Sequence, residues 1–177
     1  MTRIEFTDIL SVDDALKDKV RQWRNKEKIR KFMLTQHIIS KEEHFSWIES
    51  LKQKNNQKFW LVFADNVPIG SVYLQNINHS QLNSEWGFYI GEDAYTGKGL
   101  AKQIVYKLLS YFFDVMNFET LFTKVLPINT TALHIYKTFN FIETGKSITD
   151  SGHEVTCLRF SKADWLKIKE DLLDAGN

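Results

Sequence analysis

The chain has little of several features that identify common classes of protein. One cysteine among 177 residues excludes an internal disulfide and a zinc site with several cysteines. Its 23 lysines and arginines nearly balance 22 aspartates and glutamates, which gives no support for nucleic acid as a partner. No apolar run approaches the ~20 residues of a membrane helix, and the first ten residues lack the apolar core of a signal peptide. We therefore expect a cytoplasmic protein that binds no membrane, no nucleic acid and no metal.

Proline is equally scarce, whereas apolar residues are plentiful. The chain has two prolines, Pro68 and Pro127, and we find no internal repeat, low-complexity run or linker. Hydrophobic residues make up 43% of the sequence and aromatic residues 14%, which is enough to bury a substantial core and excludes a disordered chain. We expect a single domain that spans residues 1–177.

Hydrophobic periodicity predicts helices near the N-terminus and strands after them. Residues 11–14 (SVDD) and 40–43 (SKEE) have the pattern of a helix-opening capping box, and the first helix is expected to continue to about residue 28. An Asp-Asn pair at residues 65 and 66 predicts a hairpin turn. The expected strands are 3–9, 58–64, 69–77, 84–90, 120–126, 141–148 and 154–160, and the later helices cover residues 100–116, 129–139 and 161–173.

This order of elements predicts the fold class. Hairpin-connected strands come first and strand-helix-strand crossovers later, so the sheet should contain both antiparallel and parallel pairs. We expect an α/β fold with a central mixed, twisted sheet of about seven strands, flanked by helices on both faces.

A glycine-rich turn, Gly97-Lys98-Gly99, stands directly before the long amphipathic helix. It is neither a dinucleotide loop, because Lys102 replaces the third glycine, nor a nucleoside-triphosphate loop, because Gly91 lies one residue too far upstream. Glycines still allow close approach of a phosphate, and the amides of Gly99, Leu100 and Ala101 at the helix start would point at it. Lys98 would add charge. The alternative is an ordinary turn between a strand and a helix.

Two motifs together resemble the GCN5-related N-acetyltransferases, the GNAT family. Residues 94–99 (AYTGKG) are similar to the family's Q/R-x-x-G-x-G/A loop, except that Ala94 replaces the usual Gln or Arg. Asn129, Ala132 and Tyr136 match its Asn-x-x-Ala-x-x-x-Tyr segment, in which Asn140 replaces a glycine at a position that tolerates Asn. The resemblance covers roughly residues 3–160.

The resemblance implies a fold, a co-substrate and a reaction. The central strands should splay apart, and acetyl-CoA should bind there with its pyrophosphate on the glycine loop and its pantetheine arm along Phe88 and Ile90. The acetyl group passes directly to an amine. Tyr136 would protonate the leaving thiolate, although it could instead be a core aromatic. Asn129 would touch the cofactor, cap the following helix, or do both.

Two residues outside these motifs bear on the proton transfers. Glu85 is the candidate base that accepts the amine's proton, with an exposed strand-end glutamate as the alternative, and a water chain could take its place. Lys124 on the neighbouring strand would orient an anionic substrate or remain solvated.

The N-terminal helices resemble one branch of the family, which acetylates the 4-amino group of a UDP-linked amino sugar in pseudaminic acid biosynthesis. This resemblance rests on Trp23-Arg24-Asn25, on Phe32-Met33 and on His44 four residues after Ser40. Arg24 and His44 are therefore the candidate substrate-binding residues, since Arg can bind a phosphate with two parallel hydrogen bonds. Each has a structural alternative: an ion pair between Arg24 and Glu27 or Glu43, and a capping or surface role for His44. The enzyme would be a monomer or a homodimer.

Two other functions fit the same motifs. Acetyltransferases that act on polyamines or ribosomal proteins share the strands and the loop, but a polycation requires an acidic site, whereas residues 17–31 are rich in lysine and arginine. The chain could also be a sensor that binds acyl-CoA without catalysis, an interpretation opposed by Tyr136 and Glu85.

Overall fold

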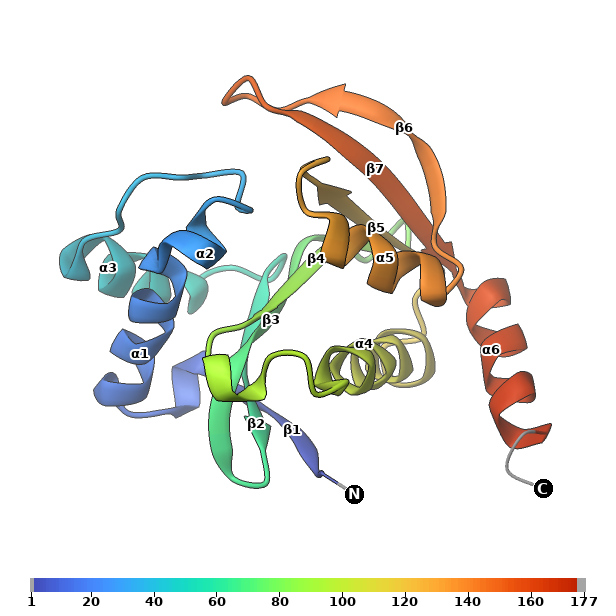
Figure 1. Ribbon diagram of the computed structural model, residues 1–177, viewed down its shortest axis with the longest axis horizontal. Coiled ribbons are helices and arrows are strands. Elements are labelled where there is room, and N and C mark those ends of the chain that lie inside the picture. Colours follow the sequence, from blue (N-terminus) through green and yellow to red (C-terminus); the bar gives the residue numbers. More distant parts are fainter. Residues whose placement is uncertain (1, 175–177) are drawn as a thin grey trace.

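A seven-stranded sheet forms the centre of the molecule, with the strands in the order β1-β2-β3-β4-β5-β7-β6 (Figure 1). The structure is a computed structural model that describes residues 2–174. Among the described strands, β4 and β5 form the one parallel pair, and all other neighbours are antiparallel. The predicted mixed sheet is therefore confirmed. The strands are β1 (Ile4–Asp8), β2 (Lys58–Ala64), β3 (Val67–Asn78), β4 (Asn83–Ile90), β5 (Thr120–Val125), β6 (Ile142–Ile148) and β7 (Glu154–Ser161).

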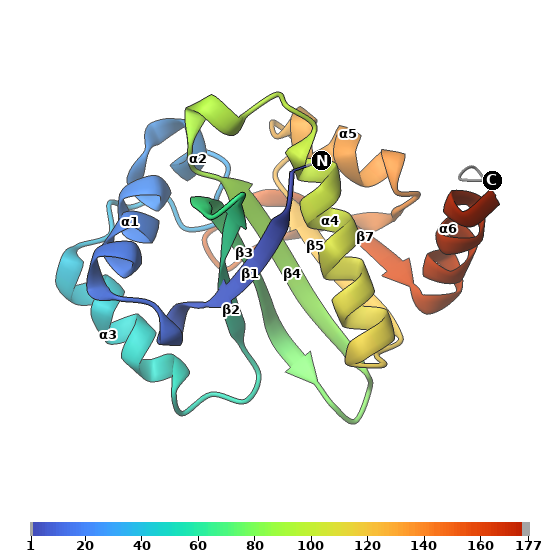
Figure 2. The ribbon, with the colours of Figure 1, turned by 90° about the horizontal axis from the view of Figure 1, so that it is seen from below.

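Helices cover the sheet in two groups, which Figure 2 shows at opposite sides of the view. One apolar cluster joins α4 and α5 to the sheet through residues such as Ile104, Leu108 and Trp86. A second cluster joins α1 and α3 to Leu61 and Tyr89 on β2 and β4. The helices are α1 (Asp14–Asn25), α2 (Glu27–Arg30), α3 (Lys41–Leu51), α4 (Leu100–Ser110), α5 (Thr130–Thr138) and α6 (Lys162–Asp174), and α4 continues into a wider turn over Tyr111–Val115.

Local signals of the sequence are confirmed at several ends of elements. Asp65 and Asn66 both have positive φ, as a two-residue hairpin turn requires. The Ser40 hydroxyl accepts a hydrogen bond from the Glu43 amide and so opens α3. Asn140 lies in the left-handed region with φ 60°, the conformation that made the replacement of glycine tolerable.

The first helix differs from its prediction at both ends. Its N-cap is Asp13, whose carboxylate accepts the Leu16 amide, whereas Ser11 lies in a preceding 3-10 turn and donates to the Asp8 carbonyl. The helix ends at Asn25 rather than near residue 28, because Lys26 has an extended ψ of 130°. The Lys26 ammonium donates to the Gly91 carbonyl, a contact across 65 residues that no local pattern reveals.

Strands β4 and β5 separate soon after they meet, which the prediction of splayed central strands anticipated. Their pairing covers three positions, from Asn83 opposite Thr120 to Glu85 opposite Phe122, although β4 continues to Ile90. On the far side of β4, the ladder with β3 continues up to Ile90. Half of β4 therefore has a free edge in the middle of the sheet.

Candidate active site

The free edge of β4 presents unpaired backbone groups at the centre of the fold. The Thr123 hydroxyl on β5 donates to the Trp86 carbonyl at 3.1 Å, so the backbone groups of Trp86 are directed toward β5. Successive residues of a strand direct their backbone groups alternately to the two sides. Those of Phe88 and Ile90 consequently face the same side, toward the gap between β4 and β5 that opens beyond Glu85. The two residues that the family resemblance assigns to the pantetheine arm thus have unpaired backbone donors and acceptors on this edge.

The glycine turn has a conformation that suits phosphate binding. Gly97 and Gly99 have φ values of 75° and 76°, and a Cβ atom at either position would meet no atom within 4 Å. Gly99 is the N-cap of α4, so the amides of Leu100 and Ala101 belong to the first turn, whose N–H groups have no acceptor within the helix. The Lys98 side chain is exposed and lies over the Tyr95 ring. The cradle is open and lined by backbone, as an approaching pyrophosphate requires.

The loop that precedes this cradle is held by ion pairs rather than by the long side chain expected at position 94. Asp93 pairs with the ammonium groups of Lys26 and Lys28, and Glu92 pairs with Lys19 at 2.8 Å. Glu92 also accepts a hydrogen bond from the Trp23 indole. The loop is thus attached to α1 and α2, which provides the support that Ala94 cannot.

Tyr136 is buried on the face of β4 that packs against α4 and α5. Its ring contacts Trp86 edge-on, with 5.4 Å between ring centroids, and Phe141 at 5.1 Å. Burial raises the pKa of the Tyr136 phenol well above its ordinary value, and the nearby Thr123 hydroxyl opposes this in part. The phenol is therefore protonated beside the gap, as a proton donor must be. Asn129 caps α5 by accepting the Ala132 amide, so its capping role is present.

The other side of the sheet holds a cavity of about 490 Å³ between the N-terminal helices and strands β2 to β4. Both candidate substrate-binding residues, Arg24 and His44, line it, although they are 20 positions apart in the sequence. Its floor is formed by aromatic residues, including Trp47, Phe59 and Tyr73. Glu43 is the acidic residue among those described as lining it, and it pairs with His37.

Arg24 extends into this cavity without a carboxylate beside it. One guanidinium nitrogen, Nη2, donates to the Thr35 carbonyl at 2.6 Å. The other, Nη1, is buried without a partner among the described residues. Burial lowers the pKa of Arg24, since a desolvated charge is disfavoured, but guanidinium stays charged at neutral pH. Arg24 therefore brings a positive charge and an unused N–H group to the cavity, the two features by which a guanidinium can bind an anion.

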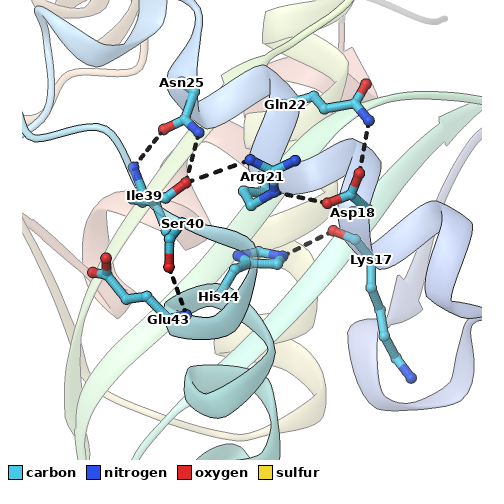
Figure 3. Close-up of polar contacts among 9 residues, drawn as sticks. All are labelled: Lys17, Asp18, Arg21, Gln22, Asn25, Ile39, Ser40, Glu43 and His44. Atoms are coloured by element: carbon cyan, nitrogen blue, oxygen red, sulfur yellow. Dashed lines mark hydrogen bonds and ion pairs between the residues drawn. The ribbon is translucent and has the colours of Figure 1, made fainter.

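His44 is buried between α1 and α3, and its ring spans the two helices (Figure 3). Nε2 lies 2.8 Å from the Lys17 carbonyl, which can only accept, so Nε2 carries the hydrogen. Burial lowers the pKa of His44, and Arg21 acts in the same direction. The neutral ring then offers Nδ1 as an acceptor, suited to a hydroxyl or N–H group of a ligand rather than to a phosphate.

The neutral state of His44 predicts a pH dependence of stability. In the unfolded chain His44 takes up a proton near its ordinary pKa of 6.5, whereas the folded ring resists protonation. The contribution of His44 to the free energy of unfolding is therefore fully present above that pH and is lost as the pH falls below it. Between pH 7.5 and 5.5 the free energy of unfolding of the wild type should fall more steeply than that of His44→Gln, by at most ~1.4 kcal/mol per pH unit. Chemical denaturation at several pH values measures this, and parallel curves would contradict it.

The segment that walls the cavity, residues 31–40, is attached to its surroundings through its backbone. Asn25 bonds both the amide and the carbonyl of Ile39 at 2.9 Å, and Arg21 donates weakly to the same carbonyl (Figure 3). From the other side, the Ser151 hydroxyl donates to the Leu34 carbonyl at 3.1 Å. Ser151 lies in the turn of the β6–β7 hairpin, which arches over β5 in Figure 1. The wall is thus held by α1 on one side and by the β6–β7 hairpin on the other.

Glu85 lies on the cavity face of β4, where the pairing with β5 ends. Its carboxylate pairs with the Lys124 ammonium at 3.0 Å, and Gln75, which lines the cavity, approaches it at 3.4 Å. The side chain of Glu85 is 22% exposed. Lys124 is therefore engaged with Glu85 rather than simply solvated, and Glu85 is linked to the cavity through Gln75.

Two tyrosines of this face, Tyr73 and Tyr89, line the cavity and were not predicted. Burial raises the pKa of Tyr73, and it raises that of Tyr89 to about 12. Their sequence signal is alternation alone, because both occupy strands in which every second residue faces the cavity. Within the described residues, no cluster of three His, Cys, Asp or Glu is arranged for a metal ion, and no helix is long and apolar enough to span a membrane.

Comparison with known proteins agrees with this geometry. Residues 6–142 match the family described as an acetyltransferase (GNAT) domain. The acetyltransferase PseH of Campylobacter jejuni is 34% identical over 120 residues, which cover 68% of this chain and 73% of that protein. The spermidine N(1)-acetyltransferase of Vibrio cholerae is 27% identical over 113 residues, which cover 61% of this chain and 65% of the relative.

Solved structures share the fold. The spermidine N-acetyltransferase of Vibrio cholerae in complex with CoA and spermine superposes with a TM-score of 0.82, at 19% identity, over 92% of this chain and 98% of that one. Campylobacter jejuni PseH in complex with acetyl coenzyme A gives a TM-score of 0.67, at 22% identity, over 90% and 99% of the two chains. The chain therefore belongs to the GNAT family and is an N-acetyltransferase that uses acetyl-CoA as its acetyl donor.

Proposed function

We propose that this enzyme acetylates the primary amine of a nucleotide-linked sugar, most specifically the 4-amino group of a UDP-linked amino sugar, in the biosynthesis of a pseudaminic acid-type glycan. The similarity to two Campylobacter acetyltransferases named PseH, at 34% and 30% identity, supports this branch of the family. We also propose that residues 1–177 are one GNAT domain, because a single sheet includes strands from Ile4 to Ser161.

The observation that carries the proposal is the uncompensated charge of Arg24. Its Nη1 group is buried without a partner among the described residues, and neither Glu27 nor Glu43, the expected carboxylates, accepts from it. A diphosphate would supply the missing acceptor and the countercharge together. His44 Nδ1, on the same cavity wall, suits a hydroxyl of the attached sugar or ribose. A nucleotide sugar combines both groups in one molecule.

The residues around the gap can carry the proton transfers. Acetyl-CoA supplies an acetyl thioester, which we place along Phe88 and Ile90 with its pyrophosphate at Gly97, Gly99 and the start of α4. Glu85, held by Lys124, accepts a proton from the attacking amine, directly or through water. Tyr136 gives its phenolic proton to the departing thiolate from the other face of β4.

A polyamine acceptor is the alternative, since spermidine acetyltransferases are among the relatives and neighbours. A polycation would require unpaired carboxylates in the cavity. Glu43 pairs with His37, while Arg24 and Lys58 add positive charge to the described lining. The electrostatics of this cavity favour an anionic acceptor.

A turnover assay tests the proposal. CoA release is measured with a UDP-linked 4-amino sugar, with the same amino sugar lacking UDP, with spermidine and with a lysine peptide. We expect the highest kcat/KM for the UDP-linked sugar and a loss of about tenfold or more without UDP, because the diphosphate contacts are missing.

The other outcomes are distinct. Faster turnover of spermidine would replace the nucleotide sugar by a polyamine. Equal rates with and without UDP would remove the diphosphate from the recognition by Arg24. Binding of acetyl-CoA without CoA release for any amine would favour the sensor interpretation.

A further inference from the structure

Tyr73 on β3 reaches across the neighbouring strand, because that strand has no side chain there. Tyr73 pairs in register with Gly87 on β4. A Cβ atom at Gly87 would lie 2.3 Å from the Tyr73 hydroxyl oxygen, 2.6 Å from Cζ and 3.1 Å from Cε1. The hydroxyl is thus the part of the ring that extends farthest over β4, toward the gap in the sheet.

The ring is held in this position from behind. It stacks on Phe59 of β2, with 5.9 Å between centroids and an angle of 2° between planes. Phe59 in turn packs edge-on against Trp47, and Trp47 packs against His44. This row of four rings leads from the wall of the cavity lined by Arg24 and His44, called the acceptor cavity from here on, to the hydroxyl of Tyr73.

The hydroxyl lies where the acceptor cavity meets the reacting groups. Its cross-strand neighbours on the cavity face of β4 are Glu85, two residues before Gly87, and Tyr89, two residues after it. The charged groups that act on it are those of Arg24 and Glu85, one from the proposed diphosphate site and one from the proposed base.

We propose that Tyr73 positions the acceptor: its hydroxyl oxygen accepts a hydrogen bond from the reacting amine, so that the nitrogen lone pair points at the acetyl thioester. The inference rests on the proposed function only in that it concerns the same acceptor site, and it holds for any amine that this cavity admits. Burial keeps the phenol protonated, so the same hydroxyl can donate to a second group while its oxygen accepts the amine N–H.

Tyr73→Phe tests this role because it retains the ring over Gly87 and removes the hydroxyl. We expect kcat/KM for the acceptor to fall about tenfold, in keeping with the loss of one hydrogen bond, while the dissociation constant of acetyl-CoA measured by calorimetry stays unchanged. Tyr106→Phe, on the exposed face of α4, is the matched control and should change neither value. Unchanged turnover, or equal losses in turnover and acetyl-CoA binding, would overturn the inference.

Gly87→Ala provides an independent test of the geometry. Its methyl group would displace the Tyr73 ring, so we expect at least as large a loss as for Tyr73→Phe. In a Tyr73→Ser background the ring is gone, and the added Gly87→Ala change should cost little more. If Gly87→Ala lowered kcat/KM equally in the wild type and in Tyr73→Ser, the loss would not come from the contact between Gly87 and Tyr73. If the wild type acetylates spermidine and no nucleotide sugar, the proposed function fails, whereas the same variants still test Tyr73 with spermidine.

Discussion

Tyr136→Phe should lower kcat by about 100- to 1000-fold, which is within the range of general acid catalysis. The variant keeps the ring and its contacts with Trp86 and Phe141, so the packing around the gap is retained. What it loses is the phenolic proton, which burial holds in place in the free enzyme. Steady-state kinetics with a saturating acceptor measures the effect.

The controls separate an acid from a core aromatic. The dissociation constant of acetyl-CoA and the melting temperature of Tyr136→Phe should match those of the wild type, because the ring is unchanged. Changing the amine acceptor should alter the rate of the variant little. An acetyl donor whose leaving thiolate is less basic should restore part of that rate, because such a thiolate needs less help from an acid. A variant with the wild-type rate would show that Tyr136 is a packing residue alone.

Arg24→Ala should lower kcat/KM for the UDP-linked sugar by about 10- to 150-fold, mainly through KM. This is the range expected for one hydrogen bond to a charged group, and the loss should be smaller for the amino sugar lacking UDP. KM for acetyl-CoA should not change, because Arg24 lies in the cavity on the other side of β4 from Tyr136. Initial-rate kinetics with both substrates varied gives the two constants.

Arg24→Lys and Arg3→Ala complete this experiment. Lysine keeps the charge but not the planar pair of donors, so it should recover only part of the affinity. Arg3, whose side chain is 78% exposed, is a control for the loss of one positive charge. Equal increases of both KM values in Arg24→Ala would instead assign Arg24 to holding the Thr35 carbonyl and the cavity wall.

The sequence predicted the parts of the fold that depend on neighbours in the chain. Alternation located the strands, the Asp65-Asn66 pair located the first hairpin turn, and the apolar stripe after Gly99 located α4. The end of α1 was predicted about three residues too late, because Lys26 leaves the helical conformation and its ammonium contacts the Gly91 carbonyl, 65 residues away. Such long-range contacts have no local signature.

The same distinction applies to the candidate site. Motif spacing led to Tyr136 and the glycine cradle, because each belongs to a short motif of neighbouring residues, 129–140 and 94–99. The hydrogen-bonding state of His44 depends on Lys17, 27 residues away, and the position of Tyr73 depends on the register of β3 against β4. Register brings Tyr73 opposite Gly87, a pairing that either strand alone does not specify.

The short pairing of β4 with β5 also has a consequence for how the molecule comes apart. Strands β1 to β4 form one antiparallel unit and β5 to β7 another. Within the sheet they are joined by three paired backbone positions, the hydrogen bond from Thr123 to Trp86 and the ion pair between Lys124 and Glu85. The boundary between these units should therefore be the first to open under heat or denaturant, ahead of the ladders on either side. A pantetheine arm lying in that boundary would act as an additional strand between β4 and β5. Binding of the co-substrate would then stabilise the boundary, so that the two units unfold together as one cooperative unit.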